Sequence, residues 1–184
     1  MPADKIEETA IKLLHSKTIA KGIYEFTYKG DSMAPMLSEG DILLAKKISP
    51  ETLRLGDIIV YKNQNQFIVH RFIYRKVEEG NIFSIVAKAD NLHECDKPFP
   101  SNSILGRAII ISKANKQLRI NTKFWKFASF FIGVMALLEV MIFTTVGNIR
   151  LIFFRKLKIK KEFREKIGKL ISIPKRIFTK ILIG

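Results

Sequence analysis

The residues best suited to chemistry lie in three short stretches of this 184-residue chain. Ser32 stands in the run GDSMAP, a turn in which a serine hydroxyl is accessible and backbone N–H groups can stabilise an oxyanion. His70 lies within the apolar run 67–72, and Asp90 and Asp96 follow another apolar run. Serine, histidine and an acid are the residue types of acyl transfer, because histidine accepts the serine proton and the acid fixes the tautomer of the histidine.

Taken singly, each stretch has a simpler interpretation. Small residues between strands usually form only a turn, and a lone histidine in an apolar strand is usually a hydrogen-bonded core residue. His93, Cys95 and Asp96 are close enough in sequence to suggest a metal site, but no second pair of ligands stands elsewhere in the chain. We therefore expect no metal and no cofactor, and the single cysteine excludes an internal disulfide.

The segment 23–112 that carries these residues predicts β structure. Tyr24, Phe26 and Tyr28 alternate with polar residues, the period of a half-buried strand. Further strand-like runs cover 41–47, 57–62, 66–77, 82–88 and 105–112, with turn-forming residues between them. Short strands with brief connections favour a mainly β fold, an antiparallel barrel or bent sandwich.

The charges are unevenly distributed along the chain. Residues 1–112 carry 15 basic and 14 acidic side chains, whereas residues 113–184 carry 17 basic and 3 acidic ones. A near-neutral module is thus joined to a cationic tail, which indicates an anionic partner such as a lipid surface or nucleic acid. We divide the chain into an N-terminal amphipathic helix and lead-in (1–22), a β catalytic module (23–112), a basic linker (113–126), a transmembrane helix (127–147) and a basic amphipathic tail (148–184).

The tail predicts a helical segment that associates with a membrane. A helix over 127–147 spans about 31 Å, close to the hydrocarbon thickness of a bilayer, and contains one charged residue, Glu139. Because a carboxylate inside a bilayer is costly unless it is paired, an interfacial hairpin and a helix that packs on a membrane partner subunit stay open. Residues 155–184 predict a basic amphipathic helix with few aromatic residues to stack on bases, which favours anionic lipid over nucleic acid as the partner of residues 127–184. The side of the membrane on which the module lies is left open.

Six short motifs stand in order along the β module. They are G-x-S-M-x-P at 30–35, a G-D pair at 40–41, a G-D-I-V-V-like stretch at 56–60, I-V-H-R at 68–71, a K-G-D-N-N…D-like box at 88–96 and G-R at 106–107. In order and spacing they resemble the signal peptidase I superfamily, in particular its Ser–His branch typical of archaea and the eukaryotic endoplasmic reticulum. The resemblance covers residues 26–112 and implies a signal-peptidase-like antiparallel β barrel or sandwich.

The resemblance implies a serine endopeptidase that cleaves precursor or leader peptides. Ser32 would be the nucleophile and His70 the general base. Asp96 would be the acid that orients the histidine, with Asp90 as a structural or alternative partner. The family also binds its substrate as an extended strand beside the sheet, with small residues before the cut.

The resemblance further implies Met33 and Pro35 as substrate-binding residues. Two alternative functions stay open. One is a catalytically inactive module that binds peptides or docks to membranes, which Ala89 in place of a family glycine permits. The other is a self-cleaving regulator of the repressor type.

Overall fold

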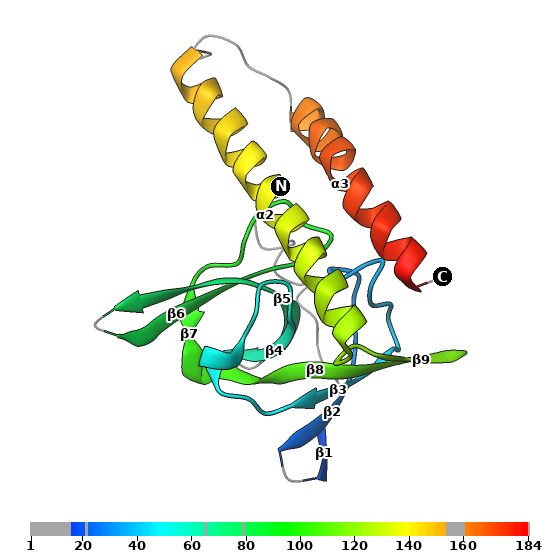
Figure 1. Cartoon of the computed structure of the whole chain (residues 1–184). Coiled ribbons are helices and arrows are strands. Elements are labelled where there is room, and N and C mark those ends of the chain that lie inside the picture. Colours follow the sequence, from blue (N-terminus) through cyan, green and yellow to red (C-terminus); the bar gives the residue numbers. More distant parts are fainter. Residues whose placement is uncertain (1–15, 21, 65, 79, 154–160, 184) are drawn as a thin grey trace.

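A computed structural model describes residues 16–183 except 21, 65, 79 and 154–160, and within them it describes side chains except at 16–20, 81, 83 and 146–171. Within these residues the chain forms one β sheet followed by two long helices (Figure 1). The strands are β1 (Ser16–Ala20), β2 (Ile23–Thr27), β3 (Ile42–Lys46), β4 (Ile58–Asn63), β5 (Gln66–Glu78), β6 (Asn81–Lys88), β7 (Phe99–Pro100), β8 (Ile104–Lys113) and β9 (Lys116–Arg119). The helices are α2 (Lys123–Phe153) and α3 (Lys161–Ile183), and the 3-10 turns are η1 (Pro50–Thr52) and η2 (Ser101–Ser103).

The sheet is antiparallel at every pairing and bends around an apolar core. Its strand order is β1-β2-β3-β8-β4-β5-β6-β7, with β9 added as a hairpin partner of β8. The order runs from β1 at one edge to β7 at the other, so the described strands form an open bent sheet. The predicted mainly β class with a helical tail is confirmed.

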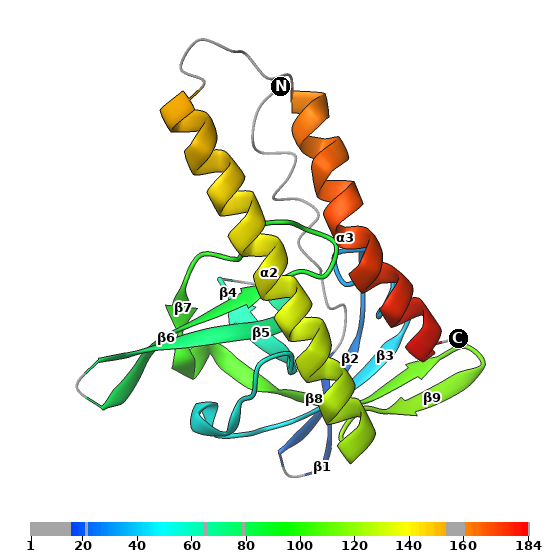
Figure 2. The same cartoon turned by 45° about the horizontal axis from the view of Figure 1, so that its top comes forward.

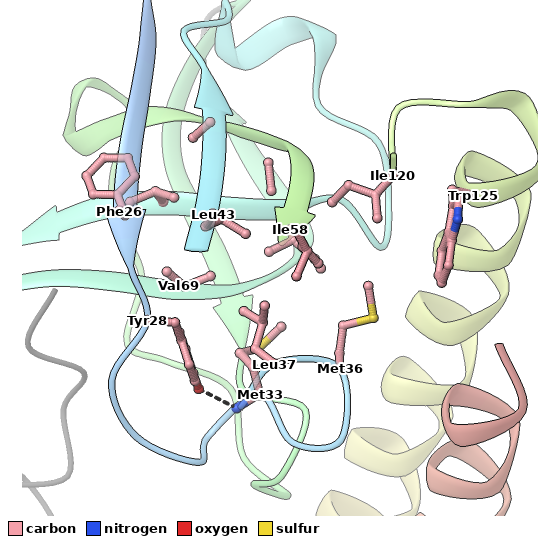
Figure 3. Packing of buried hydrophobic residues seen from close by; sticks show 14 of the residues in the cluster. Phe26, Tyr28, Met33, Met36, Leu37, Leu43, Ile58, Val69, Ile120 and Trp125 are labelled. Carbon is pink, nitrogen blue, oxygen red and sulfur yellow. Dashed lines mark hydrogen bonds between the residues drawn. The ribbon is translucent and has the colours of Figure 1, made fainter. Parts of the chain in front are cut away.

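The central strand β4 shows why these segments form strands. Its apolar run is buried on both faces, and neighbouring residues point to opposite sides of a sheet. Ile58 and Val60 join a first core cluster with Phe26, Leu43 and Val69 (Figure 3), whereas Ile59 and Tyr61 join a second cluster on the opposite face. The strand is therefore fixed from both sides, which holds the adjacent β5 in register.

The helices α2 and α3 lie side by side in both views (Figures 1 and 2), and α2 leans on the module near β5. Trp125 and Ala128 of α2 belong to the first core cluster, together with Ile120, and Leu182 and Ile183 of α3 pack against it. Figure 3 shows Trp125 on the helix beside this core. The ends of both helices are thus part of the hydrophobic core of the module.

One contact between α2 and the module joins backbone to backbone. A Cβ atom on Gly133 would lie 2.8 Å from the Cα atom of Gly56, in the turn before β4. A Cβ atom on Gly56 would lie 1.8 Å from the carbonyl oxygen of Ser129, and Gly56 has a φ of +91°. Only glycine fits at either position, because any side chain would push the helix away from the turn.

The structure corrects three of the predicted segments. In the segment 1–22, predicted as an N-terminal amphipathic helix and lead-in, Ser16–Ala20 forms the strand β1 because it pairs with β2. Residues 1–15 lie outside the described residues. The linker 113–126 is not a linker, since it contains β9 and the start of α2. The apolar helix predicted over 127–147 extends over Lys123–Phe153, and its part Lys123–Thr145 is long and apolar enough to cross a membrane.

Candidate active site

Ser32 lies in a tight turn between β2 and β3 that is anchored in the core. Met33, Met36 and Leu37 are all fully buried, so the turn is held by its own apolar side chains (Figure 3). The hydroxyl of Tyr28 accepts a hydrogen bond of 2.9 Å from the backbone N–H of Met33 and lies 3.3 Å from the Oγ atom of Ser32. These contacts fix the serine hydroxyl at the half-exposed edge of the turn.

His70 of β5 faces Ser32 across the site. Its Nε2 atom lies 3.2 Å from the Oγ atom of Ser32, and its Nδ1 atom lies 2.7 Å from the Oδ2 atom of Asp96. With Nδ1 donating to the carboxylate, Nε2 is left as an acceptor for the serine proton. The structure thus brings together three of the four residues predicted to be catalytic, in the order serine, histidine, acid.

Asp96 is positioned from two sides. Its backbone N–H donates to the carbonyl oxygen of Ala87, and Tyr61 donates a hydrogen bond of 3.0 Å to Oδ2, the same oxygen that His70 contacts. The ring of Tyr61 stacks on Phe99 with centroids 3.9 Å apart. Burial raises the pKa of Tyr61, and the nearby Asp96 carboxylate raises it further, so the hydroxyl remains a proton donor.

Asp90, the other candidate acid, points elsewhere. It accepts two hydrogen bonds from Arg71, of 2.9 and 2.6 Å, and both side chains are buried. Burial alone would raise the pKa of Asp90, but the charge and hydrogen bonds of Arg71 outweigh this effect and hold the pKa below its usual value. Arg71 also donates to the carbonyl oxygen of Gly56. Asp90 is therefore placed as a structural partner, and Asp96 is the acid beside His70.

The loop that carries both aspartates also touches the serine turn. The backbone N–H of Asn91 donates to the carbonyl oxygen of Ser32 at 2.8 Å. Lys88, at the start of this loop, is fully buried and donates to the carbonyl oxygens of Ala89, at 3.0 Å, and Leu92. Burial and the charge of Lys175 lower the pKa of Lys88 to about 8.

The two predicted substrate contacts stay predictions. The Met33 side chain is fully buried in the core and supports the turn. Pro35 is half-buried in the same turn. A hollow of about 410 Å³ opens on the serine turn without Ser32 or His70 in its lining, which consists of Gly30, Asp31, Ala34, Leu37, Ser38 and Glu39.

Tyr28 and Tyr61 are residues of the site that the sequence analysis missed. Tyr28 was predicted only as part of a strand, although it stands four residues before Ser32. Tyr61 pairs with Ile68 across the β4–β5 hairpin, so it is the diagonal neighbour of His70 on the same face. The short connection between these strands carried that signal, because a short hairpin connection fixes the register.

A family model described as Peptidase S24-like matches residues 2–109, a range that contains Ser32, His70, Asp90 and Asp96. The chain belongs to the Peptidase S24-like family. Membership places this S24-like protein among serine protease-type hydrolases and confirms the broad family predicted from the motifs, without selecting the Ser–His signal peptidase branch. The match ends before α2, and no curated protein and no solved structure matches the chain.

Proposed function

We propose that this S24-like protein is a membrane-associated serine endopeptidase that resembles signal peptidase I and cleaves precursor or leader peptides. The observation that carries the proposal is the pair of hydrogen bonds that joins Ser32 to His70 and His70 to Asp96, at 3.2 and 2.7 Å. Both distances lie within the range that proton transfer between a nucleophile and its base requires.

The reaction follows from this geometry as an acyl transfer. The Oγ atom of Ser32 attacks the scissile carbonyl while its proton moves to Nε2 of His70. The Asp96 carboxylate stabilises the imidazolium, which then protonates the leaving amine as the C–N bond breaks. Water, deprotonated by His70, hydrolyses the ester on Ser32 and regenerates the hydroxyl.

The hollow on the serine turn is consistent with a peptide substrate. It is lined by the apolar side chains of Ala34 and Leu37 and by the exposed Asp31 and Glu39. Ser32 is not one of its lining residues but its neighbour Asp31 is, and a space of about 410 Å³ can hold a side chain of an extended peptide. The small residues before the cut in the resembling family are consistent with a substrate that approaches this turn closely.

Interfacial association fits the packing of α2 better than a spanning helix. Lipid surrounds a spanning helix along its length, whereas one face of α2 is covered by the module through Gly56 and the core around Trp125. Among the described side chains of the two helices, ten large apolar ones are exposed: Phe124, Phe127, Phe130, Phe131, Leu138, Met141 and Ile142 of α2, and Ile173, Ile177 and Ile181 of α3. We infer that this apolar face lies in an anionic membrane surface, attracted by the basic residues of the tail.

The peptidase proposal is tested with a panel of precursor peptides that have small residues at alternating positions, with products located by mass. Wild type, Ser32→Ala and His70→Ala are compared, and Ser49→Ala, at an exposed serine before η1 that does not line the hollow, is the matched control. Cleavage by wild type and Ser49→Ala alone supports the proposal. Equal cleavage by all four refutes it, and products cut from the chain itself, at a rate independent of protein concentration, would indicate the self-cleaving alternative.

The membrane proposal is tested by flotation of the protein with vesicles. We expect binding to vesicles that contain phosphatidylglycerol and little binding to pure phosphatidylcholine. The double variant Phe127→Ser/Phe131→Ser should lose binding, whereas Val77→Ser, at an exposed apolar residue of β5, should not. Equal binding of both variants would contradict the assigned face.

A further inference from the structure

Glu139 lies at the centre of a buried cluster of charges between α2, α3 and the module. Its side chain is 2% exposed and contacts three partners: Lys88 Nζ at 3.1 Å, Lys175 Nζ at 2.8 Å and His93 Nδ1 at 2.7 Å. The imidazole of His93 also stacks on Phe143 of α2, with centroids 4.6 Å apart. The chain itself thus supplies partners for Glu139, which the sequence left open for another subunit.

Two of these partners belong to the loop that contacts the serine turn. Lys88 and His93 stand on either side of Asn91 along the chain, and the backbone N–H of Asn91 donates to the carbonyl oxygen of Ser32. Arg176 of α3 donates a hydrogen bond to the side-chain oxygen of Asn91. The same loop continues to Asp96, so its position affects both ends of the catalytic group.

We propose that Glu139 and Lys175 are positioning residues for this site, which makes the C-terminal helices part of the peptidase. The inference rests on the proposed peptidase function and deepens it. Glu139 directs its two oxygens at opposite ends of the segment 88–93, with Oε2 on Lys88 and Oε1 on His93. Lys175 in turn holds Oε2, so α3 fixes the carboxylate that fixes the loop.

A purely stabilising role is the competing explanation. A buried ion cluster contributes little net stability compared with apolar residues of the same volume, because the desolvation of its charges offsets their attraction. What apolar side chains cannot supply is the geometry of the hydrogen bonds, because each bond fixes one atom of the loop relative to the helices. The two explanations predict different results when the charges are replaced by apolar side chains.

The first experiment compares Lys175→Met with Lys180→Met. Both changes remove one positive charge from α3, but Lys175 is 3% exposed in the cluster and Lys180 is exposed. With the best-cleaved peptide of the panel, Lys175→Met and Glu139→Gln should lower kcat about 10- to 100-fold and change KM by less than about 2-fold. Lys180→Met should match wild type, and a kcat of wild-type size in both cluster variants would overturn the inference.

A second variant separates positioning from folding. The triple variant Lys88→Met/Glu139→Leu/Lys175→Met fills the space of the cluster and replaces both lysines and the carboxylate together, whereas the carbonyl oxygens of Ala89 and Leu92 lose Lys88 as a donor. We expect these effects to offset each other and the variant to fold with a Tm close to that of wild type. A positioning role predicts that kcat still falls about 10-fold or more. A triple variant that is stable and fully active would show that the cluster acts on stability alone.

A third measurement does not depend on a substrate. A short Nδ1–H hydrogen bond from His70 to Asp96 gives a low-field proton resonance, which isotope-labelled histidine identifies. We expect this resonance in wild type and Lys180→Met, and its loss or broadening in Glu139→Gln and Lys175→Met. Loss of the signal supports positioning even if no peptide of the panel is cleaved, whereas a wild-type signal in both cluster variants refutes it.

Discussion

Asp96→Asn should retain far more activity than Asp96→Ala, because of how the two donors meet at the carboxylate. His70 and Tyr61 both contact Oδ2, at 2.7 and 3.0 Å. An asparagine can place its amide oxygen at this point, accept both hydrogen bonds and keep the tautomer of His70 that accepts the serine proton. If the asparagine amide were turned round, its NH2 group would face Tyr61 and His70. The Tyr61 hydroxyl would then lose its acceptor, at a cost of about 1–3 kcal/mol for a buried hydroxyl.

The expected losses follow from what each substitution removes. Asparagine keeps the hydrogen bonds but removes the charge that stabilises the imidazolium. At about 4 Å and an effective dielectric constant of about 20, that charge contributes about 4 kcal/mol, a factor of about 10³ in rate. The Asp96 side chain is 21% exposed, and solvent screening lowers the expected loss in kcat to about 10²–10³. Alanine removes both charge and orientation, and a loss of about 10⁴ is expected.

Tyr61→Phe completes the test as a double-mutant cycle. Alone it should lower kcat less than about 10-fold, since His70 still contacts Asp96. In the Asp96→Asn background it removes the preference for the productive amide orientation, and a further loss of about 10-fold is expected. The assay is kcat on the best-cleaved peptide at saturating concentration. If Asp96→Asn were as inactive as Asp96→Ala and Tyr61→Phe changed nothing more, the amide N–H would be facing His70 and the reasoning would be wrong.

Three further predictions concern the supports of the site. Tyr28→Phe removes the acceptor of the Met33 N–H, so we expect the free energy of unfolding in urea to fall by about 1–3 kcal/mol and kcat to fall about 10-fold. A wild-type kcat would show that the Tyr28 hydroxyl does not assist Ser32. Gly133→Ala favours the helix by about 1 kcal/mol but puts a Cβ atom 2.8 Å from Gly56, so it should lower the free energy of unfolding by about 1–3 kcal/mol, and an increase would show that α2 is not docked. Asp90→Asn should cost about 3–5 kcal/mol at pH 7, because it leaves Arg71 unpaired. Since the pKa of Asp90 is lowered in the folded state, that difference should be constant above the usual value of 3.8 and shrink as pH falls through the folded pKa; a constant difference from pH 7 to pH 2 would contradict the pairing.

Much of the sheet could be predicted because its strands carry their own pattern. The runs predicted over 41–47, 57–62, 66–77, 82–88 and 105–112 agree with β3, β4, β5, β6 and β8 to within one or two residues at each end. The strands that were missed are β1, β7 and β9, of which β7 has two residues and β9 has four, largely polar ones. Such segments are strands only because a neighbour pairs with them, and one sequence does not contain that information.

The residue types of the candidate site could be predicted, and the resemblance implied Asp96 as the acid, with Asp90 as a structural or alternative partner. The residues alone did not decide between the two aspartates. The two aspartates differ in the β5 residue that each one contacts. His70 and Arg71 are neighbours on β5 and point to opposite faces of the sheet, so Asp96 pairs with His70 and Asp90 pairs with Arg71. The sequence indicated that Glu139 needs a partner but not which one, because three strands separate Lys88 from α2 along the chain.

The segment that becomes α2 shows how composition alone can mislead about environment. Hydropathy averages over a helix, whereas packing acts on its faces. Trp125, Ser129, Gly133, Ala136 and Glu139 follow one another at spacings of three or four and face the module, and all are buried. Phe124, Phe127, Phe131, Leu138 and Met141 occupy the opposite face and are exposed. A stripe of small residues that ends in a carboxylate requires a partner with backbone to touch and cations to pair, which lipid does not provide. In the proposed arrangement, one face of α2 packs on the module and the opposite face lies in a membrane surface. Both faces are then apolar, so the average hydropathy of α2 equals that of a membrane-spanning helix although α2 is docked on protein.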